Sequence, residues 1–397
     1  MPENEISREK LIEVASRLWE YCAKNDFSGY DPYDALNSSL VKHTPLGKSK
    51  FFRLALTQVL KRVPVNLRPI LFIPKTQNPK ALAIFLKAAL RFSAARIIET
   101  EEQINYFINR ISELRSPGML YYCWGYSFPW QTRGVLVPSG SPNLVCTVFV
   151  ADALLDAYRF SGNKHCLEMA CSAADYILDE LYWSENENAG FSYPQPDLKI
   201  HIYNADLLGA AFLAKIAKLT NNLKYIEPAL KVARCAVSRQ NKDGSWYYGE
   251  LPESRWIDNF HTGYNLVALK DISCYAETEE FNSALARGQA FYKNHFFRLD
   301  GAPKYYHNKV YPVDIHCLAQ SIITLEAVKG YDKANHRLAL SILNWALENM
   351  WSNGGYFYYR VHRFYKNRIS YLRWSQAWMA LALSLLLSKE EDQVRNG

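Results

Sequence analysis

Two short stretches of the sequence place a carboxylate next to an imidazole. Asp258 precedes His261 in Asp-Asn-Phe-His, and Asp314 precedes His316 in Asp-Ile-His. A carboxylate can orient an imidazole, which can then accept or deliver a proton. Helix capping would explain an aspartate at either place, but capping does not require a histidine two or three residues later. We therefore predict catalytic roles for both pairs.

Two kinds of chemistry fit these residue types, and the sequence leaves both open. A glycoside hydrolase uses two carboxylates as acid and base or nucleophile, for which Asp206, Asp258 and Asp314 are available. A uronate lyase or epimerase removes the proton next to a carboxylate, with histidine or tyrosine as base and arginine to neutralise the acid group. Tyr264 and Arg373 suit these two roles.

Aromatic, amide and cationic side chains accompany the predicted catalytic residues. Sugar rings stack on indole and phenol faces, and their hydroxyls bind amide and guanidinium groups, as in a concave site with a few convergent polar groups. The predicted ligand-binding residues are Trp124, Tyr126, Trp130, Arg133, His201, Asn204, Trp246, Tyr248, Trp256, Arg373, Trp374 and Gln376.

Structural roles compete with some of these predictions. Asn204, like Asn143, can cap a helix. Trp246 and Tyr248 can plug a loop against its neighbour. Arg373 opens a predicted helix, where a cation is poorly placed for the helix dipole. Its position favours an anionic ligand such as a carboxylate.

Two repeated markers predict how these residues are positioned. The first marker is a glycine followed by aromatic residues, at Gly118, Gly190, Gly244, Gly301 and Gly355. Its last three gaps are 54, 57 and 54 residues. The second marker is a polar cluster that opens an apolar run, at Asn143, Asn204, His261, His316 and Trp374. Two markers in step indicate one supersecondary unit that is stacked several times.

Each unit is predicted to be a helical hairpin. The run after Asn204 is apolar on nearly every face, which is typical of an inner helix. The next run carries apolar residues on one face only, as in an outer helix; these are Ile226, Leu230, Ala233 and Val237. The same pattern predicts helices within 7–24, 50–62, 79–95, 100–115, 143–183, 261–297, 314–351 and 371–388.

About six such hairpins predict an all-α fold, an (α/α)6-type toroid in which the last helix packs against the first. An open solenoid is the alternative, but it would leave one face of the apolar inner helices in water. We expect a single domain over 1–397, with less regular hairpins in 1–117 and clear repeats in 118–388.

The inner helices of such a ring all run in one sense, so their N-termini meet at one end. The Gly-aromatic loops lead into these N-termini, and unpaired N–H groups there favour polar ligands. We call this end the rim and predict the functional site there. Asp31 and Asp34 form a further carboxylate pair that the repeat does not place at the rim, and a capped turn explains them equally well.

Composition narrows the class of protein. The 49% hydrophobic content supplies a large core, and the charged N-terminus lacks the apolar region of a secretory signal. The most apolar stretch, Ala377–Leu387, is too short to span a bilayer. Together with eight dispersed cysteines, these features predict a cytoplasmic protein with reduced thiols.

Charge and metal-ligand spacing add further expectations. The net charge of +7 is not gathered into a basic run, so we expect no nucleic-acid partner. Asp314, His316 and Cys317 are the nearest match to a zinc set, but Cys317 should point away from its neighbour on a helix. We predict no metal and no cofactor.

Four segments resemble a bacterial family of α/α-toroid proteins whose members are often found in exopolysaccharide or capsule gene clusters. The segments are CWGYSFPWQTR at 123–133, NADLLGA at 204–210, QNKDGSWYYG at 240–249 and WIDNFHTGYN at 256–265. The family is similar in fold to six-hairpin glycosidases, toroidal polysaccharide lyases and the helical domain of uronate C5-epimerases. The resemblance covers roughly 118–388.

The resemblance implies a poly- or oligosaccharide partner, and with the basic net charge an anionic one is favoured. It implies an enzyme of cell-surface polysaccharide metabolism, and fold analogy alone slightly favours a hydrolase over a lyase or epimerase. A non-catalytic glycan-binding or assembly factor is the alternative, because an aromatic rim would serve it equally well. The oligomeric state is not indicated.

Overall fold

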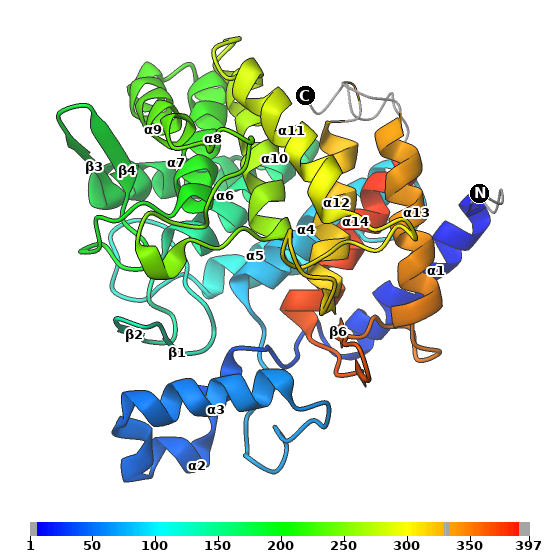
Figure 1. Ribbon diagram of the computed structural model, residues 1–397. Helices are drawn as coiled ribbons and strands as arrows, with labels where there is room; N and C mark the ends of the chain where they lie inside the picture. The colour runs from blue at the N-terminus through cyan, green and yellow to red at the C-terminus, as the bar shows by residue number, and fades with distance from the viewer. Residues whose placement is uncertain (1–5, 329, 331–333, 389–397) are drawn as a thin grey trace.

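The computed structural model describes residues 6–328, 330 and 334–388 (Figure 1). Six of the described helices form an inner ring. These inner helices are α4 (Pro79–Ala94), α6 (Leu144–Ser161), α8 (Tyr203–Thr220), α10 (Asn259–Tyr275), α12 (Ile315–Ala327) and α14 (Ala377–Leu387). Each contacts the next, and α14 packs against α4, so the ring is closed. The fold is therefore an (α/α)6 toroid, as predicted, and the open solenoid is wrong.

An outer layer of helices packs on the ring. The outer helices are α1 (Arg8–Lys24), α5 (Glu101–Glu113), α7 (Lys164–Tyr176), α9 (Ile226–Ser238), α11 (Asn282–Phe296) and α13 (Ala334–Met350). Five of them follow their inner partner in the chain, whereas α1 packs against α14 from the other end of the sequence. The predicted contact between the first and last helices is confirmed.

The burial pattern explains which helices lie inside. In α14, every residue from Ala377 to Ser384 is buried, because neighbours cover all its faces. In α9, only one face is buried, formed by Ala229, Val232, Ala233 and Ala236. The face predicted around Ile226 and Leu230 is therefore shifted, and alanines make the closest contact with the ring.

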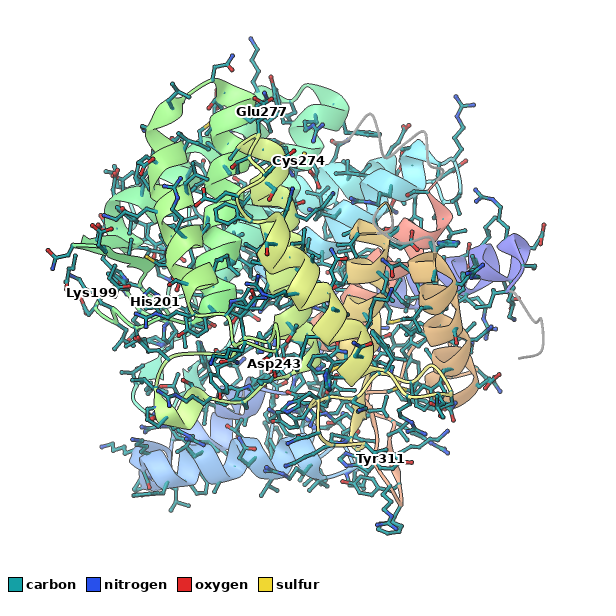
Figure 2. The ribbon with its side chains drawn as sticks, turned by 45° about the horizontal axis from the view of Figure 1, so that its top comes forward. Lys199, His201, Asp243, Cys274, Glu277 and Tyr311 are labelled. Atoms are coloured by element: carbon teal, nitrogen blue, oxygen red, sulfur yellow. The ribbon has the colours of Figure 1, made fainter. Side chains whose placement is uncertain are left out.

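The inner helices run in the same sense, so the predicted rim exists. Figure 2 shows Cys274 and Glu277, at the C-terminal end of α10, toward the top of the view. Asp243 and Tyr311, in loops that lead into α10 and α12, lie toward the bottom. One Gly-aromatic loop depends on glycine: Gly244 has φ +91°, and a Cβ there would lie 2.4 Å from the Arg287 carbonyl oxygen.

Residues 28–78 form an additional lobe on the rim, at the bottom of Figure 1. We call it the rim lobe. Its helical elements are η1 (Asp34–Asn37), α2 (Ser39–Lys42), η2 (Pro45–Lys48) and α3 (Lys50–Arg62). It has a small core of its own around Ala35, Leu60 and Ile73. The predicted helix 50–62 is confirmed as α3, but it belongs to this lobe and to no hairpin of the ring.

Short antiparallel strands lie within the loops. The paired strands are β1 (Trp130–Gln131) with β2 (Leu136–Val137), β3 (Tyr182–Glu185) with β4 (Asn188–Phe191), and β6 (Arg360–Val361) with both β5 (Val313–Asp314) and β7 (Lys366–Asn367). In the three-stranded sheet Asp314 is opposite Arg360. This register brings an aspartate of the rim next to a cation.

Short helical turns complete the described structure. They are the 3₁₀ turns η4 (Leu223–Tyr225) and η5 (Pro252–Ser254) and the π-helical turns η3 (Ile177–Leu181) and η7 (Leu372–Gln376). Turn η7 leads directly into α14 and carries Arg373 and Trp374. None of the described helices combines the length and apolar character needed to cross a membrane.

Candidate active site

Three side chains that cap inner helices lie at the rim. Asn143 caps α6 through the Cys146 N–H at 2.9 Å, Asp258 caps α10 through the His261 N–H at 3.0 Å, and Asp314 caps α12 through the His316 N–H at 2.9 Å. Capping therefore accounts for all three positions. It does not account for the imidazole rings that follow.

His261 is oriented by Asp258 and has one free ring nitrogen. The second carboxylate oxygen of Asp258 accepts from His261 Nδ1 at 2.7 Å and from the Trp256 indole N–H at 2.9 Å. Because a carboxylate only accepts, Nδ1 carries a proton, and in the neutral ring Nε2 presents its lone pair. No group in the described parts of the chain bonds to Nε2, and the side chain is 21% exposed. His261 can therefore accept a proton from a ligand.

His316 is buried and has both ring nitrogens occupied. Its Nδ1 lies 3.2 Å from the Trp374 carbonyl oxygen, so Nδ1–H donates and Nε2 accepts from the Tyr264 hydroxyl at 2.7 Å. Burial, with the nearby Lys80 cation, holds the pKa of His316 well below its ordinary range. His316 is therefore neutral, and it reaches a ligand only through Tyr264.

Aromatic rings connect the two histidines. The Phe260 ring centroid lies 4.1 Å from that of His261 and 4.8 Å from that of His316. Trp374 continues the cluster at 4.6 Å from His316. On the other side, Tyr248 lies 4.6 Å from His261 and stacks on Trp256 at 4.5 Å. The rim thus carries flat apolar faces on either side of the proton-transfer groups.

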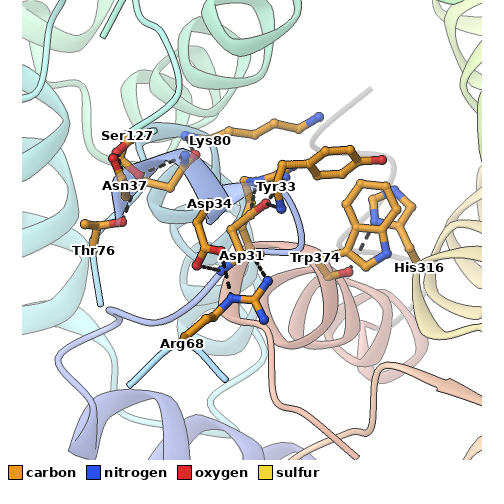
Figure 3. Close-up of polar contacts among 12 residues, drawn as sticks. Asp31, Tyr33, Asp34, Asn37, Arg68, Thr76, Lys80, Ser127, His316 and Trp374 are labelled. Carbon is orange, nitrogen blue, oxygen red and sulfur yellow. Dashed lines mark hydrogen bonds and ion pairs between the residues drawn. The ribbon is translucent and has the colours of Figure 1, made fainter. Parts of the chain in front are cut away.

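Lys80 is a buried cation that the sequence analysis missed. It lies in the first turn of α4 and is 4% exposed (Figure 3). Its Nζ lies 3.9 Å from the Phe149 ring centroid, 5.4 Å from Trp378 and 5.8 Å from Tyr264. Within the described residues Nζ forms no ion pair. The sequence did contain a clue to this residue. A lysine in the first turn of an apolar helix is unfavourable for the helix dipole, which is the argument made above for Arg373.

The environment of Lys80 changes its ionisation. Burial, reinforced by the positive charge of Arg373, lowers the pKa of the Lys80 amine to about 7. The aromatic faces attract the charged form but do not replace a carboxylate. At neutral pH Lys80 is therefore protonated only in part, and among the described residues its amine has no carboxylate partner near the imidazole of His316.

Arg373 is already paired with a carboxylate of the rim lobe. Asp31 accepts from Arg373 Nε at 2.6 Å and from Nη2 at 2.9 Å. Its neighbour Asp34 accepts from Arg68 Nε at 2.7 Å, and burial raises the pKa of Asp34 to about 6 (Figure 3). The structure therefore places both aspartates at the rim. Arg373 no longer serves as evidence for an anionic ligand.

The other predicted catalytic carboxylates are also occupied. Asp314 is fully buried, pairs with Arg360, and accepts from the Trp374 indole N–H at 2.9 Å. Asp206 is fully buried and accepts from His201 Nδ1 at 2.8 Å. These aspartates position their neighbours, and neither is exposed to a ligand. The catalytic role predicted for each is not supported by its surroundings.

Several predicted binding residues lie in the core. The indole N–H of Trp124 donates to the Ile111 carbonyl at 2.8 Å, and that of Trp246 to the Ala236 carbonyl at 3.0 Å. Gln376 is fixed to the backbone N–H and carbonyl of Phe357. These three side chains hold loops and outer helices in place. We therefore correct their predicted binding role to a structural one.

The Asn204 and His201 side chains are also buried. His201 uses both ring nitrogens, on Asp206 and on Asn188 at 2.9 Å. Burial opposes its protonation, but the hydrogen bond to Asp206 raises the pKa of His201. Asn204 is the second residue of α8 and not its cap. Both residues therefore belong to the wall behind the rim.

The remaining predicted binding residues lie on the rim. Tyr126 stacks on Phe128 with a centroid distance of 5.6 Å, and the Arg373 guanidinium lies 5.1 Å from the Tyr126 ring. Trp130 is partly exposed in β1, and Arg133 is exposed in the following turn. The Trp130 ring lies 6.1 Å from that of Tyr126, and Arg133 donates to the Glu253 carbonyl; all three remain candidates for ligand contacts.

A cavity of about 350 Å³ lies along the ring axis, toward the C-terminal ends of the inner helices. Phe149, Tyr264 and Trp378 line it, and the same three rings contact Lys80. Among its charged groups, Lys215 bonds to Asp152 at 2.7 Å and to Asp156 at 2.9 Å. Among the described residues no group of three or more metal-ligand side chains is arranged to hold an ion.

Comparisons with solved structures support the fold. A cellobiose 2-epimerase from Bacillus thermoamylovorans is similar with a TM-score of 0.61 and 11% identity, covering 79% of this chain and 89% of the other. An unsaturated glucuronyl hydrolase from Streptococcus agalactiae has a TM-score of 0.61 and 11% identity, covering 97% and 92%. A D-mannose isomerase has a TM-score of 0.57 and 12% identity, covering 78% and 86%.

These similar structures are carbohydrate-active enzymes of the (α/α)6 toroid class, and at such low identity the likeness establishes the fold. The sequence matches no protein-family model. It also matches no curated protein.

Proposed function

We propose that the protein is a carbohydrate-active enzyme that moves a proton at the carbon next to a carbonyl or carboxylate group of a sugar. The open Nε2 of His261, with Asp258 behind it, is the observation that carries this proposal. The names of two similar structures, an epimerase and an isomerase, agree with it. The sequence resemblance adds cell-surface polysaccharide metabolism as the setting.

The carboxylates argue against the two-carboxylate hydrolysis that fold analogy favoured. A glycosidase needs one carboxyl group that donates a proton and a second that attacks or activates water. Asp31 and Asp314 are each bonded to an arginine, and Asp206 and Asp258 each orient a histidine. Among the described rim aspartates none is left free to attack. Proton transfer by histidine fits the same geometry without rearrangement.

The first step is removal of a proton by His261. Its Nε2 takes the proton from the carbon, and the electron pair of the C–H bond moves toward the adjacent C=O group to form an enolate. Asp258 stabilises the imidazolium that results, because its carboxylate already accepts from Nδ1. Lys80 supplies the positive charge that the enolate oxygen needs, since no carboxylate neutralises it among the described residues.

Return of a proton completes the reaction. The Tyr264 hydroxyl is hydrogen-bonded to His316 and borders Lys80, so this pair can protonate the enolate from a direction that differs from that of His261. Delivery to the same carbon inverts its configuration. Delivery to the neighbouring carbon, together with transfer of a proton from the adjacent hydroxyl to the enolate oxygen, exchanges aldose and ketose. Loss of a substituent next to a uronate enolate instead gives elimination. All three outcomes use the same residues.

Solvent exchange tests the proposal directly. The protein is incubated in D₂O with reducing oligosaccharides and with uronate oligosaccharides, and the C–H signals next to the carbonyl or carboxylate are followed by NMR. We expect one class of sugar to lose its signal with the wild type and to keep it with His261→Ala. Release of a shorter glycan without deuterium incorporation would indicate hydrolysis. Binding without either reaction would indicate a glycan-binding protein.

A further inference from the structure

The rim lobe presents an exposed apolar surface. Its exposed large hydrophobic residues are Leu40, Leu46, Phe51, Val59, Val65, Ile70 and Phe72. They are seven of the eighteen such residues described in the whole chain, although the stretch from 40 to 72 is under a tenth of it. Phe51 is 84% exposed and Ile70 is 70% exposed. This density of exposed apolar side chains marks an interaction surface.

Ordered backbone holds these side chains outward. In α3 only Leu60 is buried, and Phe51, Ala55 and Val59 share the outer face at helical spacing. In the following turn, Phe72 has φ +48°, which is unfavourable for a residue with a side chain. The Phe72 N–H donates to the Pro69 carbonyl at 3.1 Å and fixes that turn. The exposure of these residues is therefore built into the lobe.

The same lobe is basic without compensation. Residues 39–75 contain eight Lys and Arg, and no Asp or Glu occurs between 35 and 98. Arg68 pairs with Asp34, and in the described parts of the chain the other seven form no ion pair. Lys50 and Arg62 are exposed on α3, next to its apolar outer face. The partner of this surface must therefore be both anionic and able to accept apolar side chains.

We propose that the rim lobe binds the protein to an anionic lipid membrane surface. Phe51, Val59 and Ile70 would enter the interface between headgroups and acyl chains, while lysines and arginines contact acidic headgroups. A nucleic acid or an acidic polysaccharide would satisfy the charges but would leave the aliphatic side chains in water. A second copy would oppose like charges across a symmetric contact.

Vesicle co-sedimentation of the full chain tests the proposal. The probes are phosphatidylcholine vesicles with and without phosphatidylglycerol, at low and high salt. We expect binding to the acidic vesicles, weakened by salt. We expect Phe51→Ser/Val59→Ser to reduce the partition coefficient roughly tenfold, and Lys50→Glu/Arg62→Glu to reduce it by roughly tenfold or more. All four side chains lie on the helix surface, so the thermal midpoint should not change.

Matched variants at the opposite end of the toroid provide the control. Leu223 is exposed in η4 and Lys164 is exposed at the start of α7. Leu223→Ser and Lys164→Glu should bind vesicles like the wild type. Equal loss in these controls, or no binding to acidic vesicles, would overturn the proposal. A dimer in light scattering that Phe51→Ser/Val59→Ser dissociates would also overturn it, in favour of a second copy.

Discussion

His201, His261 and His316 differ in how many ring nitrogens remain available. His201 uses both on Asp206 and Asn188, and His316 uses both on Tyr264 and the Trp374 carbonyl. His261 uses one on Asp258 and leaves the other open. All three histidines lie near an aspartate in sequence, so that feature does not distinguish them. What distinguishes their chemical roles is whether both ring nitrogens are hydrogen-bonded within the protein.

Replacing His261 should abolish proton exchange without harming the fold. We expect His261→Asn to lower the rate of deuterium incorporation by at least about 10²-fold, because it removes the base. The thermal midpoint should change little, since the ring is partly exposed. His165 is an exposed histidine on α7, and His165→Gln should leave the rate unchanged. Full exchange in His261→Asn would show that another group is the base.

The buried Lys80 amine should lower the stability of the folded protein. Its amine has a pKa of about 7 in the folded protein and 10.5 ordinarily, so the unfolded chain binds more protons between these values. The contribution of Lys80 to stability therefore rises from pH 7 to pH 10.5 and is lowest below pH 7. Lys80→Met removes this cost, so we expect a higher thermal midpoint at pH 7 and a smaller gain at pH 9.5, with loss of proton exchange.

Lys215 is the control for this prediction, because it is buried but paired with Asp152 and Asp156. Lys215→Met leaves Asp152 and Asp156 paired with Lys87 but without one of their two cations, and it should lower the thermal midpoint. Thermal unfolding of both variants across pH measures the difference. A Lys80→Met variant that loses stability at pH 7 would mean that the aromatic faces outweigh the cost of burial.

At the scale of elements, an ion pair and a side-chain hydrogen bond help to attach the rim lobe to the ring. Arg373 in η7 binds Asp31, and Arg68 binds Asp34 as well as the Tyr371 hydroxyl at 2.8 Å. All of these groups are buried, so each carboxylate cancels a charge that would otherwise be isolated. The position of the lobe over the site thus depends on the chain just before α14.

Removing one partner of the Asp31–Arg373 ion pair should lower the free energy of unfolding more than removing both partners. We expect Asp31→Asn to lower the free energy of unfolding by about 3–5 kcal/mol, because the Arg373 guanidinium stays buried without a counter-ion. The double variant Asp31→Asn/Arg373→Met should recover part of that loss. Urea denaturation of the two single variants and the double variant gives the coupling energy. Additive losses would show that the pair is not coupled.

How much of the fold and of the candidate site could be predicted depends on how far apart the contacting residues lie in the sequence. The hairpins were predictable, because each apolar run and its amphipathic partner are adjacent in sequence. Asp258 and His261 were predictable for the same reason. The contact of Asp31 with Arg373 joins residues 342 positions apart, and no local pattern encodes it. Trp124 and Trp256 look alike in sequence, yet one indole donates to a core carbonyl and the other to Asp258.

At the scale of the whole molecule, the ring joins the beginning of the chain to its end. Arg8 of α1 donates to the Leu387 carbonyl of α14 at 3.2 Å, and both helices belong to the same hairpin. Closure therefore does not depend on where the chain is interrupted, provided that the break avoids an inner helix. The turn at Asn221 and Asn222, between α8 and η4, is exposed and lies away from the rim.

A circular permutant tests this statement. The two ends are joined by a flexible linker, and the chain is opened between Asn221 and Asn222. We expect a folded protein with wild-type circular dichroism and unchanged proton exchange. A second permutant, opened between Leu154 and Leu155 inside α6, should not fold, since it exposes buried residues of an inner helix. If the first permutant also failed to fold, the order of the hairpins along the chain would matter.

Closure by α14 also has a consequence for biosynthesis. During translation, Asp31 and Lys80 leave the ribosome long before Arg373 and Trp374, and until then the apolar faces of α4 and α12 that α14 covers stay open. The rim is completed only after η7 and α14 have been synthesised. Until that stretch is made, a nascent chain holds an open ring with exposed apolar faces, and the candidate site is incomplete.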